Sequence, residues 1–212
     1  LQFVEGVARM PDLRDSSLSY RQKAQILVNE AGHNARVDYF GVSTMEGYRY
    51  GTDDGKAVYV GDRDWFLAAA SGKSFVAEPR MSRISNTMKI VYAVPIIGDN
   101  NQIVGVLSGA VKANLLSEAI KDIVLGKNGY CYILGLTGNT IADKDIGFVE
   151  DQYNSIEEAK TDPTQAPLAS FEQQALQAQA PGIGYYDSDG TSVISSYAKS
   201  KLSGWTVIMT AP

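Results

Sequence analysis

The segment at residues 60–75, "VGDRDWFLAAASGKSF", places an arginine beside two large aromatic side chains. Arg63 carries a planar guanidinium whose N–H groups donate in pairs to a carboxylate or a similar anion. Trp65 and Phe66 would exclude water from such a contact, which strengthens its hydrogen bonds. The spacing favours one wall of an anion-binding pocket with Arg63 as its polar anchor.

The residues alone also allow a structural role, in which the rings pack on a sheet and Arg63 pairs with Asp62 or Asp64. On the pocket hypothesis, further aromatic residues are candidates to line the same space, namely Tyr59, Phe75 and Tyr92. Three cationic residues downstream add positive charge: Arg80, Arg83 and Lys89. The pattern therefore leaves a binding role and a packing role open.

The sequence lacks the residues that a metal site or a catalytic pair would need. His33 is the single histidine and Cys131 the single cysteine, so neither a zinc site nor a cysteine–histidine pair has enough members. Cys131 lies in the alternating run "YCYILG", which predicts a core position, and His33 is expected to be exposed at a helix end. We expect no metal, no cofactor and no catalytic site.

Three short motifs resemble ligand loops but are incomplete. "SGKS" at 71–74 lacks the glycine of a phosphate-binding loop, because Leu67 occupies that position. "DSDG" at 187–190 lacks the later ligands of a calcium loop. With "DKDIG" at 143–147, all three are predicted to be turns.

Composition limits the class of protein. The chain has 212 residues, 44% of them hydrophobic and 20% charged, which is typical of a folded core. The net charge of −5 and the scattered Lys and Arg residues argue against nucleic-acid binding. No apolar run approaches the ~18 residues of a membrane span. The chain begins in a helical pattern and ends in a strand pattern, so we expect a fragment of a longer protein.

The hydrophobic periodicity predicts an α+β fold. Two helical patterns, at 1–10 and 19–34, precede a hairpin, a short helix in "RDWFLAAASGK", and a second hairpin within 88–116. A helix near 115–126 then leads to a second series of strands and helices with the same order, from Gly129 onward. The predicted organisation is a helical segment at 1–35 and two modules at 36–115 and 116–212, each an antiparallel sheet flanked by helices.

The order of these segments resembles the double Cache domain, the extracytoplasmic sensing module of prokaryotic transmembrane receptors. The similarity extends over "VGDRDWFLAAASGKSFVAEP", "IVYAVPIIGDNNQIVGVLSGAVKANLL" and "IVLGKNGYCYILGLTGNTIADKD". The resemblance implies a long N-terminal helix packed along two PAS-like modules, with the ligand in the membrane-distal one. Such domains belong to chemoreceptors, sensor histidine kinases and cyclic-dinucleotide enzymes such as diguanylate cyclases.

The resemblance also bears on the ligand. In the amino-acid-binding branch, an arginine, a tryptophan and another aromatic hold the ligand carboxylate, and Arg63, Trp65 and Phe66 match those positions. The aspartate that holds the ammonium corresponds to Ala110 in "GVLSGAVKA". Burying an ammonium without that partner would cost several kcal/mol unless another carboxylate replaced it, and Asp62, Asp64 and Glu78 are the candidates. We therefore expect a small carboxylate or other anion, with an amino acid as the alternative.

Location and partners follow from the same resemblance. We expect an extracytoplasmic, non-catalytic domain of a cell-membrane receptor, held by flanking transmembrane helices and paired as a homodimer through its N-terminal helix. The alternatives from other classes are a hydrolase-like enzyme and a ligand-free interaction domain.

Overall fold

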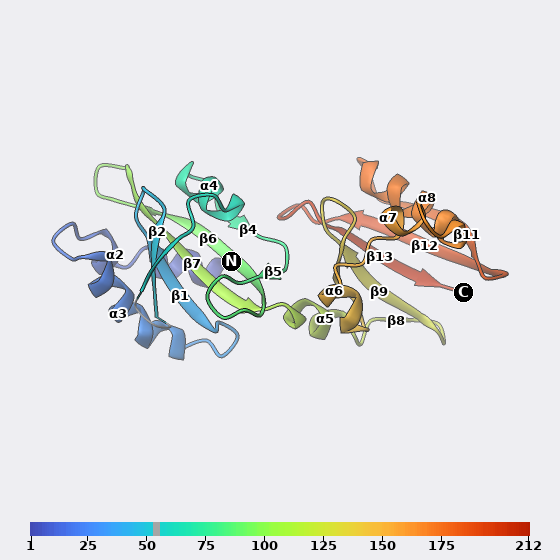
Figure 1. Ribbon diagram of the computed structural model, residues 1–212, viewed down its shortest axis with the longest axis horizontal. Helices are drawn as coiled ribbons and strands as arrows, with labels where there is room; N and C mark the ends of the chain where they lie inside the picture. The colour runs from blue at the N-terminus through green and yellow to red at the C-terminus, as the bar shows by residue number, and fades with distance from the viewer. Residues whose placement is uncertain (53–55) are drawn as a thin grey trace. The chain divides into compact units, whose positions relative to one another are not determined.

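The chain folds into two units, each built on its own antiparallel sheet (Figure 1). The structure is a computed structural model that describes residues 1–52 and 56–212. The first unit spans Leu1–Lys112 and the second Ala113–Pro212. The helical segment at 1–35 belongs to the first unit, and the division falls slightly before the predicted boundary between 115 and 116.

The structure does not show, within residues 1–35, the long N-terminal helix that the family resemblance implies. Three short helices take its place: α1 (Gln2–Ala8), α2 (Pro11–Arg14) and α3 (Tyr20–Gly32). Met10 is not helical, with φ −58° and ψ 133°, because the residue before a proline is pushed out of the helical region. Ser19 starts α3 afresh, since its side chain accepts from the backbone N–H of Gln22 while the Gln22 side chain reaches back to Ser19.

The first sheet has the order β3-β2-β1-β7-β6-β4, with β5 also paired to β6. Hairpins β1–β2 and β6–β7 confirm those predicted from alternation. The elements of this sheet and its helix are β1 (Tyr39–Ser43), β2 (Tyr48–Gly51), β3 (Ala57–Tyr59), α4 (Asp64–Ala70), β4 (Phe75–Val76), β5 (Arg80–Met81), β6 (Met88–Ile97) and β7 (Ile103–Lys112).

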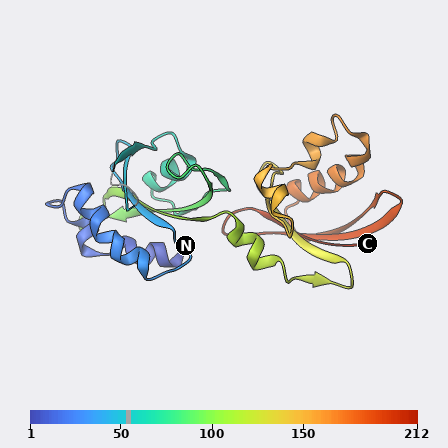
Figure 2. The same cartoon turned by 60° about the horizontal axis from the view of Figure 1, so that its bottom comes forward.

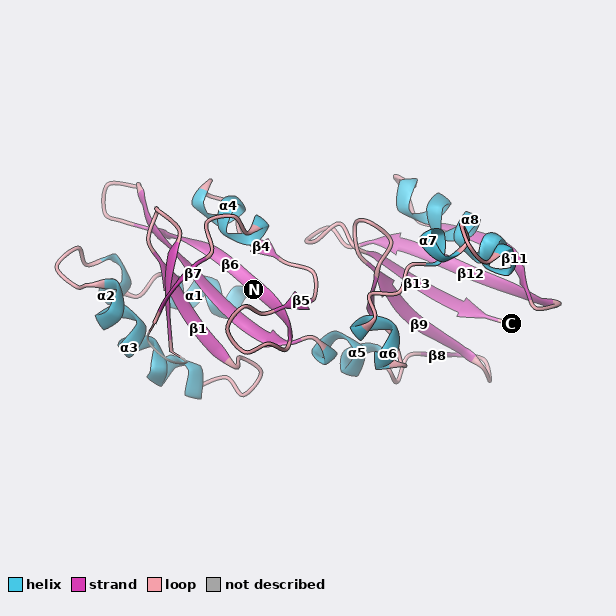
Figure 3. Cartoon of the chain, in the orientation of Figure 1, coloured by secondary structure: helices cyan, strands magenta, loops and turns pink. Residues whose placement is uncertain are grey.

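The two faces of the first sheet have different covers (Figures 2 and 3). Helices α1 and α3 pack on one face, where the Phe3 ring lies 6.0 Å from the Phe40 ring. Helix α4 packs on the other face through a cluster that contains Trp65, Phe66 and Val106. Because side chains alternate along a strand, neighbouring residues of β6 and β7 serve opposite faces.

The second sheet has the order β10-β9-β13-β12-β11, with β8 paired to β9. Helix α8 packs on this sheet through Phe171, against Tyr132, Tyr197 and Ile208. The elements are α5 (Asn114–Ile120), β8 (Val124–Leu125), β9 (Gly129–Leu134), β10 (Thr140–Ala142), α6 (Ile146–Glu150), α7 (Ser155–Glu158), a 3₁₀ turn (Pro163–Gln165), α8 (Ala166–Gln177), β11 (Gly182–Ser188), β12 (Thr191–Lys199) and β13 (Thr206–Ala211).

Two of the three predicted turns are confirmed. The "DSDG" segment joins β11 to β12, with Asp189 and Gly190 at φ 52° and 76° as a tight hairpin requires. The "SGKS" segment ends α4, and Gly72 there has φ 92°. The turn predicted for "DKDIG" is wrong, because Asp143 is buried and Ile146 and Gly147 belong to α6, which the Asp145 side chain caps by accepting from the N–H of Gly147.

Other sequence features also lie where expected. Cys131 is buried, with 2% of its surface exposed, and His33 is exposed at the end of α3. Within the described ranges, none of the helices combines the length and the apolar character needed to span a membrane.

Replacing Ser19 by alanine should destabilise the first unit. Ser19→Ala removes the hydroxyl that caps α3, at a cost of about 1 kcal/mol in the free energy of unfolding. Chemical denaturation measures this loss. Ser16→Ala, at an exposed position before the cap, is the control and should change little. An equal effect of both substitutions would show that the cap does not stabilise α3.

Candidate functional site

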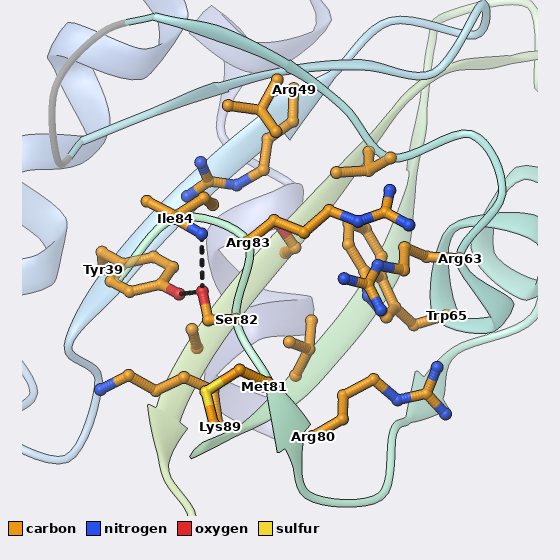
Figure 4. A pocket seen from close by; sticks show the side chains of 15 residues that line it. Tyr39, Arg49, Arg63, Trp65, Arg80, Met81, Ser82, Arg83, Ile84 and Lys89 are labelled. Atoms are coloured by element: carbon orange, nitrogen blue, oxygen red, sulfur yellow. Dashed lines mark hydrogen bonds between the residues drawn. The ribbon is translucent and has the colours of Figure 1, made fainter. Parts of the chain in front are cut away.

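The candidate site is a narrow cavity of about 50 Å³ in the first unit, between the sheet face and a loop that crosses it (Figure 4). One water-sized group takes about 10–15 Å³ of such space, so the cavity suits a molecule of only a few carbon atoms. It is lined by Tyr39, Arg49, Val58, Val60, Arg63, Trp65, Arg80, Met81, Ser82, Arg83, Ile84, Lys89, Val91, Ser108 and Ala110.

Strand alternation builds the floor of the cavity. On β7, Ser108 and Ala110 face the cavity, whereas Gly109 between them faces Phe40 and Val4 on the opposite side. The register places Ala110 opposite both Tyr39 of β1 and Val91 of β6. These strands therefore supply a single inward-facing row of side chains.

Arg63 is the residue that precedes α4, and its side chain lines the cavity. Its backbone is extended, with φ −81° and ψ 137°, and its side chain is partly buried. Asp62 and Asp64 do not neutralise it by direct pairing, because Asp62 binds Arg83 and Asp64 binds Arg80. In the described part of the chain, Arg63 forms no ion pair and no side-chain hydrogen bond.

The surroundings of Arg63 disfavour its positive charge. Burial lowers the pKa of the Arg63 guanidinium, and the nearby charges of Arg83 and Arg80 lower it further, whereas those of Asp62 and Asp64 act in the opposite direction. Trp65 is only 5% exposed and forms an apolar wall beside it. A partly buried guanidinium without a protein acceptor has donors available for an anion.

The loop over the cavity, residues 80–87 (the flap), is fastened on two sides. Arg83 donates to both carboxylate oxygens of Asp62, at 2.8 and 2.6 Å, and Arg80 donates to Asp64 at 2.8 Å. On the other side, the Ser82 and Tyr39 hydroxyls are hydrogen-bonded at 3.0 Å (Figure 4). These contacts hold the flap closed over the sheet.

Arg49 is a buried cation that the sequence analysis missed. It is 2% exposed, donates to the carbonyl of Phe40 at 3.0 Å, and lies over the ring of Tyr39. Gly41 makes room for it, because a Cβ there would overlap the guanidinium. The available signal was alternation in "YRYG", where Arg49 takes the inward position between two tyrosines.

Four of the eight candidate residues line the cavity, namely Arg63, Trp65, Arg80 and Ala110. The other four lie elsewhere. Tyr92 follows Val91 on β6 and therefore faces away from the cavity, where burial raises the pKa of its hydroxyl. Tyr59 follows Val58 in the same way, is 51% exposed, and packs against Tyr48.

Phe66 and Phe75 belong to the core under α4. Phe66 is 4% exposed within the cluster that contains Ala69, Ala77 and Ala93, and Phe75 packs against that cluster. Phe66 also lies next to Trp65, with 6.3 Å between ring centroids, and so holds that ring in place. The lining residues outside the predicted set include Tyr39, Ser82 and Ile84, which only the pairing of distant segments brings together.

Lys89 completes the set of cations. It is 7% exposed and forms an ion pair with Asp38, which lies outside the cavity wall. Among the described residues, no group of three His, Cys, Asp or Glu side chains is arranged to hold a metal ion.

An antiparallel sheet with helices on its faces and a small cavity under a flap defines a PAS-like ligand-binding module. The family model described as Cache domain matches residues 2–212, so the chain belongs to the Cache family, as a double Cache domain. Domains of this family bind ligands for sensing in chemoreceptors and histidine kinases. No curated protein sequence matches the chain.

Solved structures share the fold over almost the whole chain. The ligand-binding domain of the Pseudomonas aeruginosa amino acid chemoreceptor PctB, bound to L-Arg, has a TM-score of 0.69 and 19% identity, covering 99% of this chain and 84% of its own. That of the Pseudomonas fluorescens chemoreceptor CtaA, bound to L-alanine, has a TM-score of 0.71 and 16% identity, with 99% and 86% covered. The extracellular domain of the putative histidine kinase mmHK1S-Z2 has a TM-score of 0.69 and 13% identity, covering 98% of this chain and 86% of its own.

The ion pair between Arg83 of the flap and Asp62, which precedes α4, should persist to low pH. The Arg83 guanidinium, by donating to Asp62, lowers the pKa of that carboxyl from 3.8 to about 2. The folded pKa lies below the unfolded one, so the contribution of the pair is complete above pH 3.8 and is lost as pH falls through about 2. Carboxyl NMR should place the Asp62 titration near pH 2 in the wild type.

Arg83→Gln is the matched variant, because it keeps a side-chain donor but removes the charge. The pKa of Asp62 should then rise toward 3.8. An unchanged midpoint in Arg83→Gln would show that Arg83 does not hold this carboxylate.

Proposed function

We propose that the chain is the extracytoplasmic sensing domain of a transmembrane signal-transduction receptor and binds a small carboxylate or similar anion in its first unit. One observation carries the proposal: five cations line the cavity (Arg49, Arg63, Arg80, Arg83 and Lys89), and no carboxylate among the described residues does. A cavity with this charge attracts anions. Arg63 is the anchor, because it has donors without a protein acceptor in the described chain.

Amino acids are the alternative ligands. PctB and CtaA, which share the fold, are described with L-Arg and L-alanine bound. In this chain, Ala110 lines the cavity at the position where the amino-acid-binding branch has its aspartate. With cations around it and no carboxylate in the wall, a ligand ammonium would be repelled rather than paired. The charge therefore favours a ligand with a carboxylate and without an ammonium.

The sheet offers a route from ligand to signal. Strands β6 and β7 carry cavity residues on one face and pack against α1 on the other. A ligand that binds one arrangement of these strands more tightly shifts the population toward it and moves α1 with it. In our proposal that movement passes to transmembrane segments beyond the chain, within a homodimer joined through the N-terminal helices. The relative mmHK1S-Z2 is likewise described as an extracellular domain.

The hydrolase alternative has little support. Ser82 and Ser108 line the cavity, but His33 is exposed at the end of α3 and is not part of the wall. A serine nucleophile needs a base within hydrogen-bond reach, and neither serine has a histidine there. The serine hydroxyls instead donate or accept within the protein, as Ser108 does to the carbonyl of Gly41 at 3.1 Å. A ligand-free interaction domain would not explain why five cationic side chains line the cavity.

Removing the charge of Arg63 should weaken binding of small carboxylates. L-lactate and pyruvate serve as probes, measured by calorimetry on the wild type and on Arg63→Gln. The loss of charge-assisted hydrogen bonds of about 1.5–3 kcal/mol corresponds to an affinity lower by about ten- to a hundredfold. Lys73→Gln, an exposed cation outside the cavity wall, is the control. Equal affinity of both probes for wild type and Arg63→Gln would refute the role of Arg63.

Placing a carboxylate at position 110 should reverse the preference for ligand charge. L-lactate and L-alanine differ only in a hydroxyl or an ammonium on the same carbon. The wild type should prefer L-lactate, whereas Ala110→Asp should lose L-lactate and gain L-alanine, because the new carboxylate pairs with the ammonium. Competitive calorimetry gives the ratio of the two affinities. A wild type that already prefers L-alanine by about tenfold or more would favour the amino-acid alternative.

A further inference from the structure

The second unit contains a larger cleft with the opposite chemistry. Its volume is about 670 Å³, which is in the range of small-molecule sites. It lies between the inner face of the sheet (β9 and β11 to β13) and the segments from α6 to α8. Its aromatic lining consists of Tyr130, Tyr132, Phe148, Tyr153 and Tyr186.

The buried charges of this cleft are negative. Glu172 of α8 is 3% exposed and Asp143 is 5% exposed, and both line the cleft. Glu172 accepts from the Tyr132 hydroxyl at 2.8 Å and from the Ser155 hydroxyl. Asp143 accepts from the backbone N–H of Asp145 at 2.8 Å. Within the described chain neither carboxylate forms an ion pair, and no Lys, Arg or His lines the cleft.

The electrostatic environment agrees with these contacts. Burial raises the pKa of Glu172 and of Asp143, although hydrogen bonds from Ser155 and Tyr132 act against the shift at Glu172. Burial also raises the pKa of Tyr130 to about 12, and the nearby Asp143, Tyr186 and Glu172 add to this effect. Negative charge is therefore costly here, and a cation would lower that cost.

One cation of the chain already occupies the edge of this region. The Lys144 ammonium lies over the Tyr130 ring, 4.0 Å from its centroid. This is the geometry of a cation–π contact, in which the face of the ring attracts positive charge. Lys144 is otherwise exposed, so the contact can open without disturbing the core.

We propose that the second unit binds a small organic cation, an amine or a quaternary ammonium compound, in this cleft. The tyrosine rings, with Phe148, contact its apolar and cationic surface, while Glu172 and Asp143 supply the opposite charge. The combination of aromatic rings and buried carboxylates is what recognition of an ammonium group requires. This site is separate from the carboxylate site, because all of its residues lie in Ala113–Pro212.

Calorimetry with choline and its neutral isostere 3,3-dimethylbutan-1-ol tests the charge requirement on the whole chain. Ethylammonium and 1,4-diaminobutane extend the probes to primary amines. We expect at least one cation to bind with a dissociation constant below about 1 mM, and choline to bind at least about tenfold more tightly than the isostere. Failure of all three cations to bind, or equal binding of choline and the isostere, would overturn the proposal.

Three variants locate the site. Glu172→Gln and Asp143→Asn keep hydrogen-bonding side chains and should each weaken binding of the cation by about tenfold or more. Glu150→Gln removes an exposed carboxylate of α6 outside the cleft and should leave binding unchanged. If Glu150→Gln weakens binding as much as the other two, the probe responds only to net charge and the proposed site is wrong.

Lys144→Gln gives an expected gain rather than a loss, so misfolding cannot imitate it. Removing this ammonium frees the face of Tyr130 and removes a like charge, and the affinity for the bound cation should rise several-fold. An unchanged or weaker affinity in Lys144→Gln would show that the cation does not use the Tyr130 face. L-lactate binding should be the same in all these variants, which separates this site from the site at Arg63.

Discussion

The first unit depends on an imbalance of charge around one small cavity. Five cations face it, and the carboxylates that pair with Lys89, Arg83 and Arg80, namely Asp38, Asp62 and Asp64, stand outside its wall. Each of these ion pairs is itself structural, since those of Asp62 and Asp64 hold the flap. Arg63 lies between them with no acceptor among the described residues. Burying a guanidinium without an acceptor is unfavourable, and an anion from solution removes that cost.

Strand alternation is the second constraint, and it connects the cavity to the rest of the unit. Val91 and Ala110 face the cavity, whereas Tyr92 and Gly109 face the α1 side. Any shift of β6 or β7 that improves contact with a ligand therefore also changes the packing of α1. Interiors are close-packed, so such a shift moves neighbouring elements rather than being absorbed locally. In the proposed mechanism, the same two strands therefore contact the ligand and pass its effect to α1.

Much of this could be predicted from the sequence. The hydrophobic periodicity predicted the hairpins and the short helix that contains Trp65. The residue types predicted that Arg63 and Trp65 line a pocket, and both line the cavity. The prediction that Tyr59 and Tyr92 line the same space as Arg63 failed, because a one-residue step along a strand turns a side chain to the other face of the sheet. The family resemblance implied one long helix, but Pro11 and the cap at Ser19 break it. The sequence could not predict that Tyr39 and Ser82 line the cavity, because only tertiary pairing brings together residues that are 43 positions apart.

The two units place opposite charges around their cavities on one type of architecture. In both, the ligand space lies between a sheet face and the segments that cross it. The inward positions of the first sheet include Arg49 and Lys89, whereas the cleft of the second includes Glu172 and four tyrosines. The backbone hydrogen bonds of a sheet do not depend on these side chains, so the fold leaves the charge of each site free to vary. In our two proposals, the charge of the side chains that line each space, rather than the fold, decides which ions each unit binds.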